Sequence, residues 1–429
     1  MKGKRRRRFW EGCKTLLIVL LSCSAVFLAS RTLLPQGGRA FLSRLSQPSV
    51  SSAAPGDSAR SAQTLQPAAF AVTWEEGRYA VLYHQEDQEG YTRISALLSE
   101  ALSEAGQPSP ITARQWELAL TQPGVFCEYP SVMPLDILNR WLSDQDNPVL
   151  TGYSGQRLCA TADALYFSLP GEDEQYYCAP LRNDLSASLT YLSQRFSANG
   201  ARFACEDGSC PLLRRDALVL SATPSVPQLM SEQPFSIDES NTPDEGLSRI
   251  LQLLSFHPQT NPLYAITGGY AITDGGETLR VTDGLITYRR TNENAVRFPA
   301  ASPLDATRAL AEETVGALGG SARLYLRDVI EAENVTTITY SYAYHGAVIQ
   351  QGAEDYCAKF TVKDGAITAL ELRPRRYTVL EDQNVTLLPQ KQAAAIVGSK
   401  GSNLVILYED SLSAQSQLAP FWATRTEGR

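Results

Sequence analysis

Residues 242–289 read TPDEGLSRILQLLSFHPQTNPLYAITGGYAITDGGETLRVTDGLITYR and contain the signals that decide the fold. Thr242 supplies a capping hydroxyl, Pro243 suits a first helical turn, and the acid three positions after the cap completes a capping box. The apolar residues that follow recur at helical spacing: Leu247, Ile250, Leu251 and Leu254. Farther on, Asp283-Gly284 separates two alternating runs, which is typical of a tight hairpin turn. The stretch therefore predicts a helix packed on an antiparallel sheet, and hence an α+β fold.

The same order of signals appears a second time downstream. Ser302-Pro303-Leu304-Asp305 repeats the helix start, Gly319-Gly320 supplies a left-handed stop, and Asp364-Gly365 repeats the hairpin turn. The strands of this copy alternate between polar and apolar residues, so we expect the helix to cover one face of the sheet. The repeat predicts two helix-on-sheet modules, a middle one over residues 228–298 and a carboxyl-terminal one over residues 299–429.

Residues 70–222, upstream of the repeat, predict a first α+β domain. Strand-like residues at 79–83 are followed by apolar residues at helical spacing over 94–102. Pro224 and Pro227 are expected to mark the end of this domain, because proline interrupts regular structure.

The amino terminus has the pattern of a membrane anchor. A basic arm over residues 1–14 precedes sixteen uncharged residues at 15–30, and a transmembrane helix over 15–34 is predicted. Because Lys and Arg remain on the cytoplasmic side, the arm is expected inside and the remainder of the chain outside the cell membrane. Residues 35–69 are rich in Ser, Ala, Gln, Gly and Pro, which predicts a flexible tether.

Two other interpretations of this segment stay open. The small residues near Ala29-Ser30 also suit a cleaved signal peptide. A lipoprotein signal ending at Cys23 is less favoured, because the apolar run continues past that cysteine.

Small residues form a stripe on the predicted membrane helix. Ser22, Ala25 and Ala29 fall at i, i+3 and i+7, which places them on one face. Helices in lipid associate through close packing at small residues, so this stripe is the predicted partner face. Ser and Ala are also ordinary fillers of a membrane helix, and that alternative has equal weight.

The charge distribution excludes nucleic acid as a partner. The net charge of the chain is −8, and the first fourteen residues carry seven basic side chains against Glu11 alone. The remainder therefore carries −14, and an acidic exported part repels phosphate backbones.

No pattern of catalytic or metal-binding residues emerges from the sequence. His84, His257 and His345 are isolated, and no two of them have the spacing of a zinc site. The second glycine of a nucleophile elbow is replaced by glutamine after Ser154, and the carboxylates at 172–174 are expected in a solvated loop. We therefore predict no catalytic residue, no metal and no cofactor, and we expect the chain not to be an enzyme.

Six cysteines follow the predicted anchor. Cys205 and Cys210 are separated by Glu-Asp-Gly-Ser, a spacing that a disulfide can close after export. The alternative of two free thiols has equal weight.

Residues 251–289 resemble the middle region of the YycH and YycI regulators of Gram-positive bacteria. In that family a helix leads into a Gly-rich hairpin, a T-L-R-[IV] strand and an Asp-Gly turn, and the strand and turn correspond here to residues 278–284. The single anchor with an exported remainder agrees with the family, whereas the long tether and the exported cysteines depart from it. The resemblance implies a non-catalytic, single-pass regulator of a two-component system. Its implied partner is a sensor histidine kinase of the WalK type, with a second single-pass regulator as a further candidate.

Two other classes of function remain open at this point. One is a membrane-anchored extracytoplasmic module that binds a ligand or peptide, which a deep pocket would favour. The other, less favoured, is an exported cell-wall enzyme whose site is assembled from residues distant in the sequence.

Overall fold

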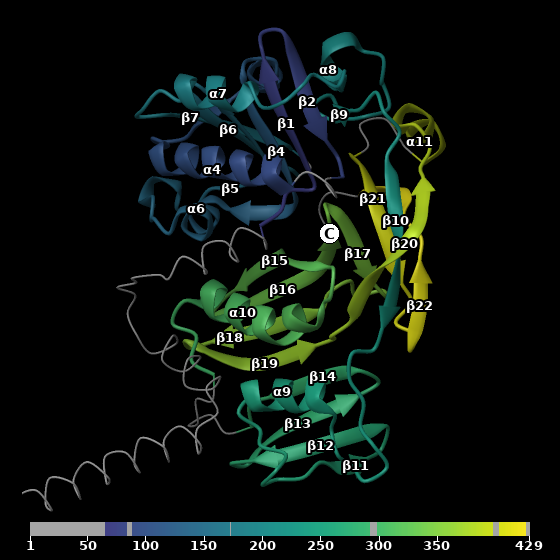
Figure 1. Cartoon of the computed structure of the whole chain (residues 1–429). Helices are drawn as coiled ribbons and strands as arrows, with labels where there is room; N and C mark the ends of the chain where they lie inside the picture. Colours follow the sequence, from purple (N-terminus) through teal and green to yellow (C-terminus); the bar gives the residue numbers. More distant parts are fainter. Residues whose placement is uncertain (1–64, 84–87, 172, 292–297, 398–402, 426–429) are drawn as a thin grey trace, which may run out of the picture.

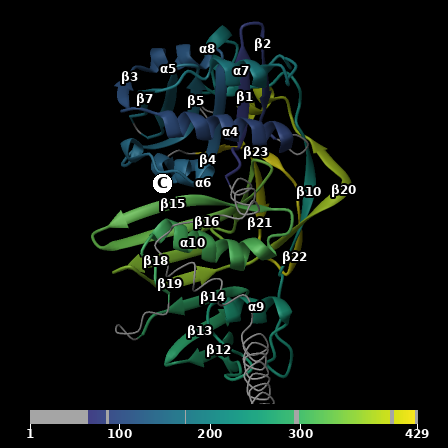
Figure 2. The same ribbon diagram turned by 60° about the vertical axis from the view of Figure 1, so that its left-hand side comes forward.

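The computed structural model describes residues 65–83, 88–171, 173–291, 298–397 and 403–425. It has a mixed α+β fold in which strands form most of the regular structure (Figure 1). Two large sheets carry the helices, and a three-stranded sheet runs along one side of the molecule (Figures 1 and 2). This architecture confirms the predicted α+β class with antiparallel sheets, although β17 (Ala347–Gln351) and β21 (Asn403–Asp410) form one parallel pair.

Helices of the described ranges include none that is long and apolar enough to cross a membrane. The basic arm at 1–14, the predicted transmembrane helix at 15–34 and its face of Ser22, Ala25 and Ala29 lie outside those ranges.

The described fold begins at Leu65. Its side chain is 4% exposed within the core, and its carbonyl accepts a hydrogen bond from the Tyr91 hydroxyl at 2.7 Å. The predicted tether at 35–69 therefore overlaps the packed fold at its carboxyl end.

The first sheet has seven strands in the order β2-β1-β4-β5-β6-β7-β3, with antiparallel neighbours. The strands are β1 (Ala69–Trp74), β2 (Gly77–Val81), β3 (Ser109–Ile111), β4 (Gly124–Pro134), β5 (Ser154–Thr161), β6 (Ala164–Leu169) and β7 (Gln175–Pro180). One face is covered by α4 (Gln88–Glu104), α6 (Leu135–Ser143) and α7 (Ser186–Ser193), and a 3-10 turn, η1 (Pro148–Leu150), follows α6. The other face is covered by α5 (Ala113–Leu120) and by the small elements β8 (Arg202–Phe203), α8 (Ala204–Asp207) and β9 (Leu218–Val219). Because side chains alternate along a strand, Leu158 packs on the α4 side and Cys159 on the α5 side.

The second sheet has eleven strands and joins the two predicted modules. The first module supplies β11 (Tyr264–Ile266), β12 (Gly269–Asp274), β13 (Glu277–Thr282) and β14 (Leu285–Arg289). The second supplies β15 (Arg323–Ala332), β16 (Val335–Tyr344), β17 (Ala347–Gln351), β18 (Ala358–Lys363), β19 (Ala366–Leu372), β21 (Asn403–Asp410) and β23 (Phe421–Arg425). Strands β14 and β19 pair through Ile286 and Leu372, so the repeated units form one continuous sheet.

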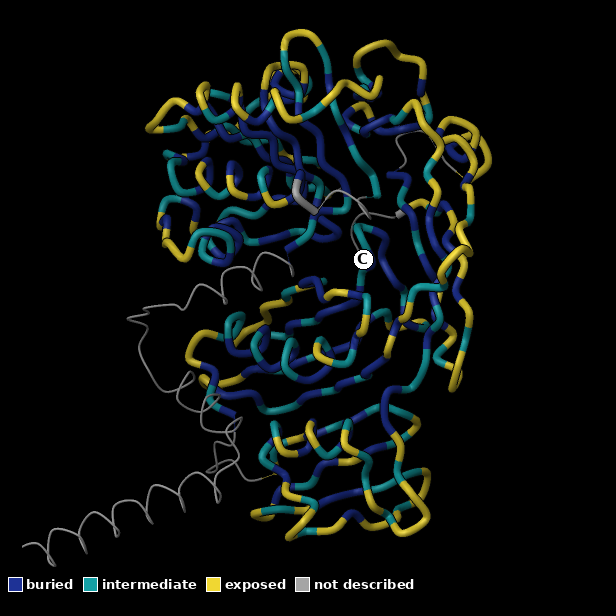
Figure 3. Tube along the Cα trace, viewed as in Figure 1, coloured by how far each residue is buried: buried dark blue, intermediate teal, exposed yellow. Residues whose placement is uncertain are grey.

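Helices cover this sheet as the repeat predicts. Figure 1 shows α9 (Glu245–Leu253) over β13 and β14, and α10 (Pro303–Ala311) over β16 and β18. A π-helical turn, η2 (Glu312–Gly316), continues α10, and α11 (Gln390–Val397) packs near β23. In Figure 3 the buried positions follow the strands and the inner helix faces, while exposed positions gather at hairpin tips.

Local turn signals are confirmed, with one correction. Asp283-Gly284 and Asp364-Gly365 have positive φ at both residues, as tight hairpin turns of the primed type require. Gly320 is left-handed with φ +67°, as predicted for a helix stop. The cap of α9 is Asp244 rather than Thr242, because the Leu247 amide donates to the Asp244 carboxylate at 2.9 Å.

The third sheet takes its central strand from the segment around Pro224 and Pro227. Its strands are β10 (Ser225–Glu232), β20 (Arg376–Thr386) and β22 (Gln415–Leu418), in the order β20-β10-β22. Pro227 lies inside β10, at the start of a register shift against β20. A β-bulge accommodates the missing amide of Pro227, which therefore lies within a strand, while Pro224 directly precedes it.

Candidate functional site: two buried arginine clusters

Arg157 lies at the centre of the most extensive cluster of ionised side chains in the described residues. It belongs to β5 and is 1% exposed. Its guanidinium contacts Glu128 at 3.2 Å, Glu174 at 3.0 Å and Asp216 at 3.5 Å, and it also donates to the Ser168 hydroxyl at 3.4 Å. One buried cation therefore gathers carboxylates from β4, from the turn before β7 and from the segment before β9.

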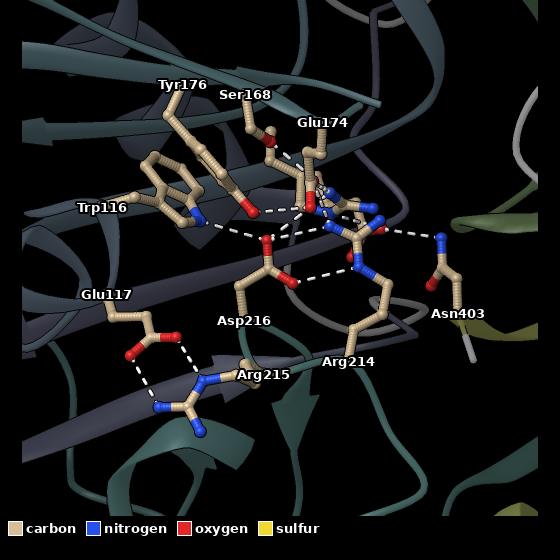
Figure 4. A network of polar contacts seen from close by, with 11 residues as sticks. Trp116, Glu117, Ser168, Glu174, Tyr176, Arg214, Arg215, Asp216 and Asn403 are labelled. Carbon is tan, nitrogen blue, oxygen red and sulfur yellow. Dashed lines mark hydrogen bonds and ion pairs between the residues drawn. The ribbon is translucent and has the colours of Figure 1, made fainter. Parts of the chain in front are cut away.

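A second arginine completes the cluster. Arg214 binds both oxygens of Asp216 at 3.1 Å and also contacts Glu174. The Trp116 indole donates to Asp216 at 3.1 Å, and the Tyr176 hydroxyl donates to Glu174 at 2.6 Å. Figure 4 shows Trp116 and Arg214 directed at Asp216, and Tyr176 directed at Glu174. Burial of charge is tolerated here because each group has charged or hydrogen-bonding partners.

The electrostatic balance keeps Asp216 ionised. Burial acts to raise the pKa of this carboxyl, but attraction by Arg157 and Arg214 and hydrogen bonds from Trp116 and Arg214 outweigh it, so the pKa is lowered. Burial and the bond to Glu174 raise the pKa of Tyr176. At neutral pH the cluster therefore holds a carboxylate and a neutral phenol, an arrangement suited to stabilising the fold.

The cluster reaches the second sheet through β21. The Asn403 amide, at the start of that strand, donates to Glu128 at 3.3 Å. Glu128 thus links β4 and β5 of the first sheet to an edge region of the second.

At the other end of β21, Asp410 forms a second buried cluster. Asp410 is 0% exposed and accepts hydrogen bonds from Arg375 at 3.1 Å, Tyr377 at 3.0 Å and Ser231 at 2.5 Å. Gln351 of β17 donates to the Tyr377 hydroxyl at 3.0 Å. Ser231 and Tyr377 belong to the third sheet, so this cluster fastens the second sheet to the third.

The histidines occupy separate places. His84 lies outside the described residues. His257 is an exposed loop residue after α9, where its carbonyl accepts bonds from the amides of Thr260 and Asn261. His345 is left-handed in the β16–β17 turn, and burial with a contribution from Arg323 lowers its pKa to about 4.

The structure leaves the thiols of Cys205 and Cys210 free. Cys205 lies on α8, and Cys210 follows the left-handed Gly208 that ends this helix. Burial and nearby carboxylates raise the pKa of Cys205 to about 11. A disulfide between these residues stays a prediction.

The carboxylates after β6 depart from expectation in one respect. Glu174 is half-buried instead of fully solvated as predicted, because it contacts Arg157, Arg214 and Tyr176. The sequence did carry one signal for this cluster, an arginine in the otherwise uncharged strand 154–161. A charge in a buried strand requires a partner, but the pattern does not say which one.

Comparisons with protein families, with curated proteins and with solved structures find no match to this chain.

Proposed function

We propose that this chain is a non-catalytic, membrane-anchored extracytoplasmic regulator that binds a sensor histidine kinase and modulates its signalling in cell-wall homeostasis. The cell membrane holds its single anchor, with the amino terminus in the cytoplasm. A second single-pass regulator is a further proposed partner, and nucleic acid is not.

The observation that supports this proposal is the pair of buried clusters at the two ends of β21. Asn403 joins this strand to the first sheet through Glu128, and Asp410 joins it to the third sheet through Arg375. A regulator that acts by contact needs a surface of fixed shape, because ordering a mobile surface on binding weakens the complex. The two clusters connect three sheets through β21 and therefore help to keep the surface of the molecule in a fixed shape.

The proposed partner face in the membrane consists of Ser22, Ala25 and Ala29. Substituting isoleucine at Ala25 and Ala29 adds bulk where close helix packing is proposed, without adding charge. A matched control replaces Leu20 and Phe27 by isoleucine, since 100° per residue places them on the opposite side of the predicted helix.

The test is affinity purification of the full chain from detergent-solubilised membranes, followed by identification of bound proteins. We expect a histidine kinase with the unsubstituted chain and with the control, and its loss from the Ala25→Ile, Ala29→Ile variant. Absence of any kinase from the unsubstituted chain contradicts the proposed function. Equal recovery with all three chains contradicts the membrane face and favours contact through the exported sheets.

A further inference from the structure

A groove of about 500 Å³ opens at one end of the first sheet. The sheet register brings three segments together there, because Thr73 of β1 pairs with Gly124 of β4, which pairs with Thr161 of β5. The groove is lined by the end of β1, the loop before β4, the β5–β6 turn and one face of α7. A volume of this size suits a small ligand of a few rings.

An aromatic side chain forms part of the wall. Trp74 ends β1 and is half-buried, which leaves part of its indole facing the groove. The ring packs closely over Gly77, where an added Cβ would lie 3.3 Å from the Trp74 ring and 2.8 Å from Ala198. The absence of a side chain at residue 77 thus lets the indole pack closely against the hairpin.

The polar groups around this ring are acceptors or neutral groups. Glu75, Gln122 and Asp163 line the groove and are exposed. Ser186 and Thr190 of α7 also line it, and their hydroxyls donate to Asp184 and to the Ser186 carbonyl at 2.6 and 2.8 Å. Their oxygens consequently remain available as acceptors.

The charge of the groove excludes an anionic ligand. Its described lining contains two carboxylates and no Lys, Arg or His. Arg78 reaches it only by a hydrogen bond to Thr73 at 2.8 Å, while its guanidinium pairs with Glu206 and lies 4.5 Å from the Phe203 ring centre. A ligand suited to this lining donates hydrogen bonds, carries no negative charge and presents a flat apolar face to an indole.

We propose that this groove is a binding site for a neutral oligosaccharide. A sugar ring stacks its C–H face on Trp74, and its hydroxyls donate to Asp163, Glu75 and the α7 hydroxyl oxygens. A metal ion fits the lining less well, since the described residues contain no group of three or more His, Cys, Asp or Glu side chains able to hold one. This proposal goes beyond kinase regulation and does not depend on it.

The test is calorimetric titration of the full chain, kept in a detergent without a sugar head group so that the detergent does not compete. The probes are tri-N-acetylchitotriose and maltotriose, with spermidine and inorganic phosphate as charged comparisons. We expect saturable binding of at least one trisaccharide below about 10 mM and none of phosphate. Absence of trisaccharide binding, or binding of spermidine or phosphate alone, overturns the proposal.

Variants locate the binding. Trp74→Ala is expected to weaken trisaccharide affinity about tenfold or more, whereas Trp74→Phe retains affinity within about threefold. Asp163→Asn preserves the acceptor for the Thr161 hydroxyl, at 2.9 Å in the native chain, and is expected to weaken binding about threefold. The matched control is Glu76→Gln, which neutralises an exposed carboxylate adjacent to Glu75 but outside the lining. Unchanged affinity in both Trp74→Ala and Asp163→Asn refutes the site, even if the chain binds saccharides elsewhere.

Discussion

Replacing Arg157 by methionine removes the cation that three carboxylates share. The side chain is 2% exposed, and its contacts with Glu128, Glu174 and Asp216 lie between 3.0 and 3.5 Å. Breaking a buried pair by removing one partner costs about 3–5 kcal/mol, and the lower end, about 3 kcal/mol, applies here because Arg214 still pairs with Asp216 and Glu174. We expect Arg157→Met to lower the free energy of unfolding by about that amount at pH 7.

The loss of stability in Arg157→Met should become smaller at low pH. The folded pKa of Asp216 is depressed, so its contribution to stability is present above the ordinary carboxyl pKa near 4 and is lost as pH falls through the folded value. Without Arg157, the Asp216 carboxylate loses one of the interactions that lower its pKa, while the bonds from Arg214 and Trp116 remain. Once Asp216 is protonated in both chains, the lost attraction no longer distinguishes them. The difference in stability between the two chains should therefore shrink as the pH falls below about 4.

Urea unfolding followed by tryptophan fluorescence measures the effect, because Trp116 is buried against Asp216. The matched control is Arg215→Met, whose side chain is 70% exposed and pairs with Glu117 at the surface. This control should change stability by about 1 kcal/mol or less. Equal losses in the two variants, or a loss for Arg157→Met that stays constant from pH 7 to about 3, would refute the reasoning.

Three further results are expected. Asp410→Asn leaves the buried Arg375 without its carboxylate and should lower the free energy of unfolding by about 3–5 kcal/mol in the same assay. The control Glu409→Gln, at an exposed neighbouring residue, should lower it by about 0.5 kcal/mol, and similar losses in the two variants would argue against the second cluster. A chain that begins at residue 70 loses the buried Leu65, so its free energy of unfolding should be at least about 2 kcal/mol lower than that of a chain that begins at residue 64. Equal free energies of unfolding would place Leu65 outside the cooperative fold. A carboxyl-terminal reporter that is active only in the cytoplasm should remain inactive on the full chain, and activity would reverse the proposed topology.

The sequence predicted the local features of the fold well, because their causes are local. An Asp-Gly pair adopts positive φ at low cost wherever it occurs, so the turns at 283–284 and 364–365 could be placed without knowledge of the remaining chain. The helix start near Thr242 was displaced by two residues, since Asp244 also offers a capping oxygen and reaches the Leu247 amide.

Long-range pairing could not be predicted in the same way. Ile286 pairs with Leu372, and no periodicity in either segment specifies the other, so two predicted modules became one sheet. Strand β20 is largely exposed and polar, which removes the alternation that identifies a strand. The buried clusters could not be predicted for the same reason, because Asp216 lies far along the chain from Arg157, and Asp410 lies far along the chain from Arg375.

Kinase autophosphorylation in lipid vesicles tests the central claim most directly. The co-purifying histidine kinase is reconstituted alone, with the full chain, or with the Ala25→Ile, Ala29→Ile variant, and phosphate incorporation from ATP is followed over time. The account predicts that the full chain changes the rate of autophosphorylation and that the double substitution abolishes most of this change. An identical rate with and without the full chain, at a molar excess that occupies the kinase, would contradict it.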